Sequence, residues 1–386
     1  MSFSPGDVIL QDFTMSGAAG SVDIRARVMN FSIYENIKTP YISIVAKIKD
    51  NTDMLNQNLG LDGTNNLTIS FSQPGQKPYK GTFRIMEVEK GRTLQNQRTA
   101  EYTITGYSPH MTNQPKVQKA YKEVPATQVA NDLIENILKP AKKLIINAPS
   151  KGLVGNKDMP YNVNGVNIHK AIRSVLSRAA SIKDVSSAYV FFENQTNMVI
   201  DTLENLMKQA MAGNGPTFYQ RPMGLDFLND VAIQPFIILA MREESRASAT
   251  DNILNEKQAT NIFDLFSNQF QKGQTKDAAT YLNIPYNMLR PPTFIANFLN
   301  QRKKIAGQFD SQSATIQVSL NTDLTVGSGF VINTIAPVGI MDTAVPDRIS
   351  GPMLATEVRH TVLLTQQRMQ GMTTVRGTKG NLGLNQ

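Results

Sequence analysis

The chain has 386 residues, of which 41% are hydrophobic, a formal net charge of +8 and no cysteine. This length is sufficient for about two to four compact units, and the absence of cysteine excludes disulfides, thiolate metal sites and cysteine nucleophiles. The longest nearly apolar stretch, residues 231–241, is too short to cross a bilayer, and residues 1–7 lack a secretory signal. We therefore expect no membrane span and assembly in a reducing cytoplasm.

A first β domain is expected over residues 1–112. Apolar and polar residues alternate with the period of half-buried strands in five segments, which are residues 22–28, 42–48, 67–71, 83–88 and 102–106. Turn-forming residues such as Gln73-Pro74-Gly75 separate them. Short strands at this spacing predict a small antiparallel barrel or sandwich.

An α+β domain is expected over residues 113–211, because the apolar period changes to that of helices. One helix is predicted between Pro125 and Pro140, and a second over 168–180, with Asn167 as its N-cap. Two short strands at 188–193 and 198–200 then precede a third helix near 203–211. Residues 212–250 are predicted to form a linker and the start of a second β domain.

Residues 251–308 are predicted to be a helical insertion, because Ala259–Phe270 and Thr293–Ile305 each place apolar residues on one helical face. The strand period returns at residues 316–320, 330–332 and 354–364, which predicts a second small β-barrel over 309–377, and residues 378–386 are expected to be a flexible tail. The predicted fold class is α+β and mainly β, with two antiparallel barrels around an α+β domain.

The motifs of catalysis and cofactor binding do not occur at their usual spacings. The three histidines, His110, His169 and His360, are far apart and form no zinc motif. Adjacent Glu243 and Glu244 could form an acid/base pair, but neighbouring residues rarely direct both carboxylates at one bond. We therefore predict no enzyme activity, no cofactor and no metal.

Positive charge is concentrated in two parts of the sequence. Residues 114–183 carry twelve lysines and arginines against four carboxylates, and a second basic stretch follows Glu357. Such regions favour an acidic partner protein, nucleic acid or an anionic surface, although a solvated face is the simpler interpretation. The candidate partner-binding residues are Lys139, Lys142, Lys143, Arg368, Arg376 and Lys379.

Several short segments, in a fixed order over residues 21–377, resemble the central baseplate hub proteins of contractile-tailed bacteriophages. They are Phe31–Tyr41 and Phe83–Val88 in the first β domain, Lys116–Tyr121 and Tyr189–Asn194 in the α+β domain, and Ile349–His360 in the second β domain. The family implies two similar, tube-like barrels in each chain. Residues 254–308 match nothing in the family pattern.

The resemblance implies a structural protein of the virion tail baseplate, assembled in the host bacterial cytoplasm. Three copies would form a ring of six barrels that adapts a six-fold tail tube to a three-fold central spike and leaves a channel through which DNA passes without specific binding. Tail tube, spike and wedge or sheath proteins would be its partners. The alternatives are the hub part of another contractile injection system, a tail-associated cell-wall hydrolase, and a sequence-independent DNA-binding protein.

Overall fold

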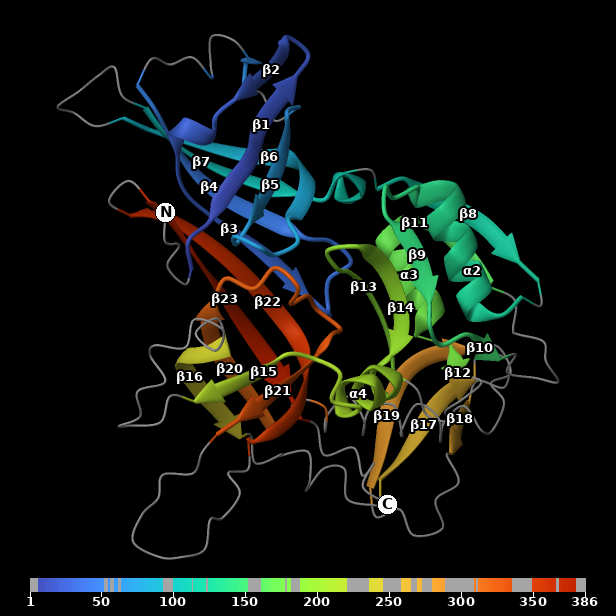
Figure 1. Ribbon diagram of the computed structural model, residues 1–386. Coiled ribbons are helices and arrows are strands. Elements are labelled where there is room, and N and C mark those ends of the chain that lie inside the picture. The colour runs from blue at the N-terminus through green and yellow to red at the C-terminus, as the bar shows by residue number, and fades with distance from the viewer. Residues whose placement is uncertain are drawn as a thin grey trace, which may run out of the picture.

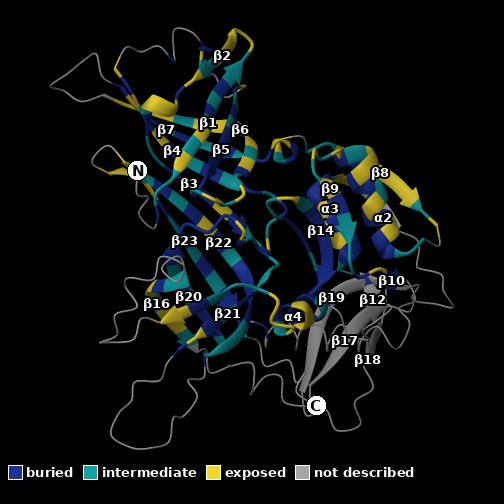
Figure 2. Cartoon of the chain, viewed as in Figure 1, coloured by how far each residue is buried: buried dark blue, intermediate teal, exposed yellow. Residues whose placement is uncertain are grey.

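Three units, each with its own hydrophobic core, and one small separate sheet make up the described part of the computed structural model (Figure 1). The structure describes residues 6–51, 55, 59–61, 64–92, 100–112, 114–122, 124–151, 161–177, 179–181, 188–220, 236–245, 258–264, 269–272, 280–288, 309, 312–334, 349–365 and 368–379. Most of them lie in strands, and Figure 2 shows buried positions alternating with more exposed ones along the strands of the two β units. The mainly β class predicted from the sequence is confirmed.

The first β unit is a sheet of seven strands in the order β2-β1-β5-β6-β7-β4-β3. Its core is a cluster of aromatic and aliphatic side chains that includes Phe13, Phe31 and Phe71, with ring centroids 5.4 and 5.1 Å apart along that series. The strands are β1 (Ile9–Gly17), β2 (Gly20–Asp23), β3 (Val28–Asn36), β4 (Ser43–Asp50), β5 (Asn66–Ser72), β6 (Tyr79–Arg92) and β7 (Ala100–Tyr107).

The strand predicted over residues 22–28 is wrong in its extent. β2 ends at Asp23, Arg25–Arg27 form a 3-10 turn, and β3 begins only at Val28. The Asp23 carboxylate explains the break, because it accepts hydrogen bonds from the Arg25 backbone at 3.0 Å and from its guanidinium at 2.6 Å. A side chain that bonds to the backbone two residues on offers an alternative to the strand ladder.

The α+β unit consists of short strands and helices around a core that includes Val129, Ile172 and Ile200. Its first helix begins at Ala126 as predicted, and its second follows Asn167, whose side chain accepts a hydrogen bond from the Lys170 backbone N–H at 3.0 Å. The elements are β8 (Lys116–Tyr121), α2 (Ala126–Asp132), a π-helix (Leu133–Leu138), β9 (Lys143–Ile146), β10 (Ser150–Lys151), β11 (Tyr161–Asn167), α3 (Ile168–Leu176), β12 (Ala180–Ser181), β13 (Tyr189–Glu193), β14 (Asn197–Thr202) and α4 (Leu203–Met211).

The second β unit is a closed ring of pairings, in which β22 pairs with β21 and β23 and the remaining strands follow in the order β21-β15-β16-β20-β23. The strands are β15 (Thr217–Gln220), β16 (Ile237–Ser245), β20 (Gln312–Ser319), β21 (Gly329–Asn333), β22 (Gly351–Thr365) and β23 (Arg368–Thr378). β15 departs from the predicted antiparallel arrangement, since it pairs in parallel with β16 and β21. It enters the ring from the segment after α4, and not from a hairpin, which would make it antiparallel.

The two β units are joined edge to edge. β3 pairs with β22 over seven residue pairs, from Glu357 opposite Asn36 to Leu363 opposite Asn30, so that one sheet of 13 strands runs through both units. The Ser32 and Thr361 hydroxyls add a side-chain hydrogen bond of 3.1 Å across this seam. The rainbow colouring of Figure 1 shows the consequence, because blue and red strands lie side by side.

The first part of the predicted helical insertion is wrong. Strands β17 (Gln258–Asp264) and β18 (Gln269–Lys272) occupy the segment predicted as a helix, and with β19 (Thr280–Met288) they form a small sheet. The aromatic and β-branched residues of this segment favour strands once a partner strand is available, and pairing with β19 overrides the local helical period. The second predicted helix, at 293–305, and the tail beyond 379 lie outside the described residues.

Among the helices of the described ranges, none is long and apolar enough to span a membrane.

Candidate docking groove at the unit junction

A buried carboxyl group connects the two β units. Glu35 is on β3 in the first unit, and its Oε2 accepts hydrogen bonds from the Thr325 hydroxyl and, at 3.1 Å, from the Val326 N–H of the second unit. The Tyr79 hydroxyl donates to Oε1 at 3.4 Å, and the Tyr79 ring packs against His360 with centroids 5.6 Å apart. These polar groups lie in the seam where β3 meets β22.

Burial changes the acidity of these groups. It is the main cause that raises the pKa of Glu35 to about 7, because water no longer solvates the carboxylate, and nearby Glu193 adds to the effect. Hydrogen bonds from Thr325 and Val326 and the charge of Lys142 oppose the shift. Burial also lowers the pKa of His360 to about 4, so this imidazole is neutral at physiological pH.

A second buried carboxylate connects the α+β unit to the first β unit. Glu193, at the end of β13, forms an ion pair with Lys142 at 2.8 Å. It also accepts a hydrogen bond from the Ile42 N–H at 3.1 Å. His110 Nε2 lies 3.8 Å from the same carboxylate and 2.7 Å from the Pro40 carbonyl oxygen. Glu193 therefore joins the α+β unit to the first β unit, together with the hydrogen bond of 2.9 Å from the Arg173 guanidinium to the Lys38 carbonyl oxygen.

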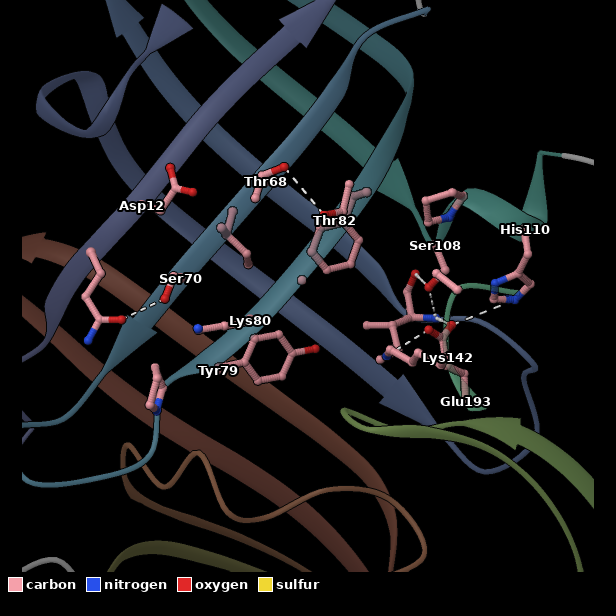
Figure 3. Close-up of a pocket in the computed structure, with 18 of the residues that line it drawn as sticks. Asp12, Thr68, Ser70, Tyr79, Lys80, Thr82, Ser108, His110, Lys142 and Glu193 are labelled. Carbon is pink, nitrogen blue, oxygen red and sulfur yellow. Dashed lines mark hydrogen bonds and ion pairs between the residues drawn. The ribbon is translucent and has the colours of Figure 1, made fainter. Parts of the chain in front are cut away.

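A groove with a volume of about 940 Å³ opens beside this junction. One wall is the outer side of β1, β5 and β6, and the other is the segment from Leu138 to Lys142. Figure 3 shows how the polar side chains divide, with Asp12, Thr68, Ser70, Lys80 and Thr82 along the strands and Ser108, His110, Lys142 and Glu193 grouped at the opposite end. The concave shape and mixed lining are typical of binding sites.

The groove wall of the α+β unit ends in an unusual backbone conformation. The helix after α2 widens into a π-turn over Leu133–Leu138, and Lys139 then adopts the left-handed conformation with φ 50° and ψ 58°. It is the one residue other than glycine with a positive φ in the described part of the chain. Such conformations are more costly for lysine than for glycine, and both π-turns and left-handed residues occur often at functional sites.

The three candidate residues of the α+β unit differ in their surroundings. Lys139 and Lys143 are exposed, whereas the ammonium of Lys142 is held by Glu193 and by the Asn194 carbonyl oxygen at 2.6 Å. Lys142 therefore has an internal structural role. Lys139 and Lys142 both line the groove.

The other three candidates lie on or beside β23, in the second β unit. Arg368 is exposed, whereas Arg376 lies 3.2 Å from Glu244 and 3.7 Å from Glu357, and Lys379 donates to the Ser350 carbonyl oxygen at 2.7 Å. Two of these three cations thus make contacts within the chain.

Glu35, Glu193 and Tyr79 make buried contacts that no sequence motif predicted. A signal was present for the two acids, because Glu35 continues the inward-facing series of Phe31 and Ile33, and Glu193 ends a strand whose apolar positions are buried. An acid at an inward position is rarely buried without a partner, so alternation alone predicts a buried polar contact there. In the described ranges, no three histidine or acidic side chains come together as a metal site requires.

Comparisons with known proteins identify the fold. No family model and no curated protein matches the sequence. Among solved structures, the chain is similar to the tail protein from Neisseria meningitidis MC58, with a TM-score of 0.56, 11% identity and coverage of 95% of this chain and 96% of that one.

Two further structures extend this result. The 43 kDa tail protein of prophage MuSo2 from Shewanella oneidensis gives a TM-score of 0.56 at 10% identity, covering 95% of this chain and 97% of that one. A chain of the lidded Francisella PdpA-VgrG complex gives 0.53 at 8% identity, covering 97% of this chain and 53% of that one. The chain therefore has the fold of phage tail proteins.

Proposed function

We propose that the chain is a structural protein of a contractile phage tail that forms the central hub of the baseplate. The observation that supports this most directly is the similarity to two tail proteins over nearly the whole of both chains. The arrangement of two β units joined through β3 and β22, with an α+β unit beside them, suits a protein whose surfaces bind other subunits. The function resides in interfaces and requires no catalytic step or cofactor.

In this proposal three copies form a ring. The two β units act as equivalent, tube-like barrels, so that three chains present six barrels to the tail tube and a three-fold surface to the central spike. Wedge or sheath proteins bind around the ring, and DNA passes through its centre without specific binding. The exposed cations Lys139, Lys143 and Arg368 contribute to partner binding on the outside of this ring.

A second candidate is the hub part of another contractile injection system. The similarity to a chain of the PdpA-VgrG complex favours it. This chain matches about half of that longer chain, as a hub part within a longer protein would. Both candidates are structural. A tail-associated hydrolase is disfavoured because Glu193, which lines the groove, already binds Lys142 and the Ile42 N–H.

The test is the solution mass of the purified chain by light scattering, alone and with the spike protein of the same particle. Three chains of 42.6 kDa give about 128 kDa. We expect this mass in at least one of the two samples, and imaging of that sample should show a ring in end view. A monomer or dimer in both samples would refute the hub assignment. Release of peptidoglycan fragments by the purified chain would instead establish a hydrolase.

A further inference from the structure

We propose that the groove between the first β unit and the α+β unit binds an extended, acidic segment of a partner protein, with Lys80 and Lys139 on opposite walls contacting its carboxylates. The inference rests on the proposed function in one respect, namely that the partner is a neighbouring protein of the same tail. The binding site itself is defined by this chain alone.

The two walls offer different chemistry to such a segment. The strand wall presents the hydroxyl groups of Thr68 and Thr82, which lie 3.4 Å apart and can bond to the backbone of an extended chain. The opposite wall presents Ala141, whose exposed methyl group can pack against a small apolar side chain of the segment. An extended peptide whose acidic residues occur in adjacent pairs, separated by small apolar residues, matches both walls, because the two members of a pair point to opposite sides.

The charges that line the groove favour a carboxylate ligand. Lys142 and Glu193 neutralise each other at 2.8 Å, which leaves Lys80 and Lys139 against the single carboxylate of Asp12. Asp12 is itself bonded to the Thr14 hydroxyl at 2.5 Å. A nucleic acid is a poorer match, because the aromatic rings of the lining, Tyr79 and Phe83, are buried and cannot stack on bases.

The backbone conformation of Lys139 supports the same binding site independently of its charge. This position follows the last turn of a helix and has φ 50°, a conformation that glycine adopts without steric cost. The Lys139 N–H bonds to the Ile134 carbonyl oxygen at 2.8 Å, which holds the left-handed turn in place. A lysine at a site suited to glycine, at the edge of a groove, indicates that its side chain is needed for binding.

Replacement of Lys139 by glycine should raise stability and weaken binding at the same time. The substitution should raise the thermal unfolding midpoint by about 1 to 2 °C, because strain is relieved. It should also weaken ligand binding about fivefold, because one charged contact is lost. Lys80→Gln should weaken binding by a similar factor with no gain in stability, and Lys47→Gln, at an exposed position of β4, should change neither quantity.

The binding experiment uses the full chain and a fluorescein-labelled ten-residue peptide in which pairs of glutamates alternate with pairs of alanines, and binding is followed by fluorescence anisotropy at low salt. A peptide in which pairs of lysines alternate with pairs of alanines is the control. Binding of the acidic peptide alone, weakened in Lys139→Gly and Lys80→Gln, would support the proposal. No binding, equal binding of both peptides, or unchanged binding by Lys139→Gly would overturn it.

The wild-type chain separates this inference from the proposed function. Light scattering with the spike protein reports assembly of the ring, and fluorescence anisotropy reports binding of the acidic peptide. If wild type forms the trimer but does not bind the acidic peptide, the groove assignment fails and the hub assignment stands. If wild type binds the peptide but forms no trimer in any mixture, the hub assignment fails and the groove assignment stands.

Discussion

Replacement of Glu35 by glutamine should abolish one pH-dependent component of stability. The folded pKa of Glu35 is raised from 4.5 to about 7, chiefly by burial, so the folded chain retains a proton that the unfolded chain releases between these values. The contribution is fully present below pH 4.5 and is lost as the pH rises through about 7. A shift of this size corresponds to about 3 kcal/mol.

Glutamine has nearly the same shape as glutamic acid and stays neutral at every pH. Its carbonyl oxygen can still accept from Thr325 and Val326, and its amide can donate to the Tyr79 oxygen. We therefore expect wild type and Glu35→Gln to have similar free energies of unfolding near pH 5. Near pH 8 the variant should be more stable by about 2 to 3 kcal/mol, because wild type then contains a buried charge.

The assay is urea unfolding of both proteins from pH 5 to pH 8, and the quantity of interest is the difference between their free energies of unfolding. Taking the difference removes every other titrating group from the comparison. Glu101→Gln is the matched control, because Glu101 is exposed on β7, and its difference from wild type should stay flat. Parallel curves for wild type and Glu35→Gln would refute the assignment of the proton to Glu35.

Three further substitutions test other parts of the structure. Glu193→Ala should lower the free energy of unfolding by about 2 to 3 kcal/mol. In a double-mutant cycle with Lys142→Met, measured by urea unfolding, the two losses should deviate from additivity by at least about 1 kcal/mol, and simple additivity would contradict the ion pair. Asn167→Ala should lower stability by about 1 kcal/mol in thermal unfolding while Asn167→Asp does not, and equal losses would argue against the N-cap. Gly215→Ala should lower the free energy of unfolding by more than about 3 kcal/mol, because the new Cβ would lie 1.8 Å from the backbone oxygen of Gly329 at the start of β21. Gly91→Ala is the control, since its Cβ would meet nothing closer than 3.8 Å, and similar urea midpoints for the two variants would contradict this packing.

The local elements that the sequence predicted best are those with short-range signals. Asn167 precedes an apolar helical stripe, and both the cap and the buried positions Ile168, Ile172 and Val175 are confirmed. The strand Tyr189–Glu193 and the helix Leu203–Met211 were also predicted almost to the residue. In each case the residues that determine the element are its own neighbours in sequence.

Elements that depend on distant partners were missed. β23 contains Gly371 and Gly377, which weaken a strand signal, yet a Cβ at Gly377 would lie 2.4 Å from the Phe330 ring. Glycine is required there by packing against another strand, and no local pattern reveals that. The same holds for β17, whose strand conformation depends on β19, and for the groove, which forms only where two units meet.

The groove itself had no signal in the sequence. Positive charge marked both Lys139 and Lys142 as partner-binding candidates, which stays a prediction, and charge alone could not show that Lys142 is held within the chain by Glu193. The left-handed conformation of Lys139 also had no sequence signal, because glycine is the residue expected in that conformation.

The seam between β3 and β22 has a consequence for synthesis on the ribosome. Its hydrogen-bonded hydroxyls, on Ser32 and Thr361, are separated by 329 residues. At ordinary elongation rates, β3 waits on the order of 20 to 60 s before its partner strand is made. Throughout that time its edge can pair with another nascent chain, and neighbouring ribosomes on one messenger bring such chains close together. A chaperone that covers this edge would raise the yield of correctly folded protein, because it would prevent pairing with another nascent chain. Slow adoption of the strand conformation by β3 would have the same effect.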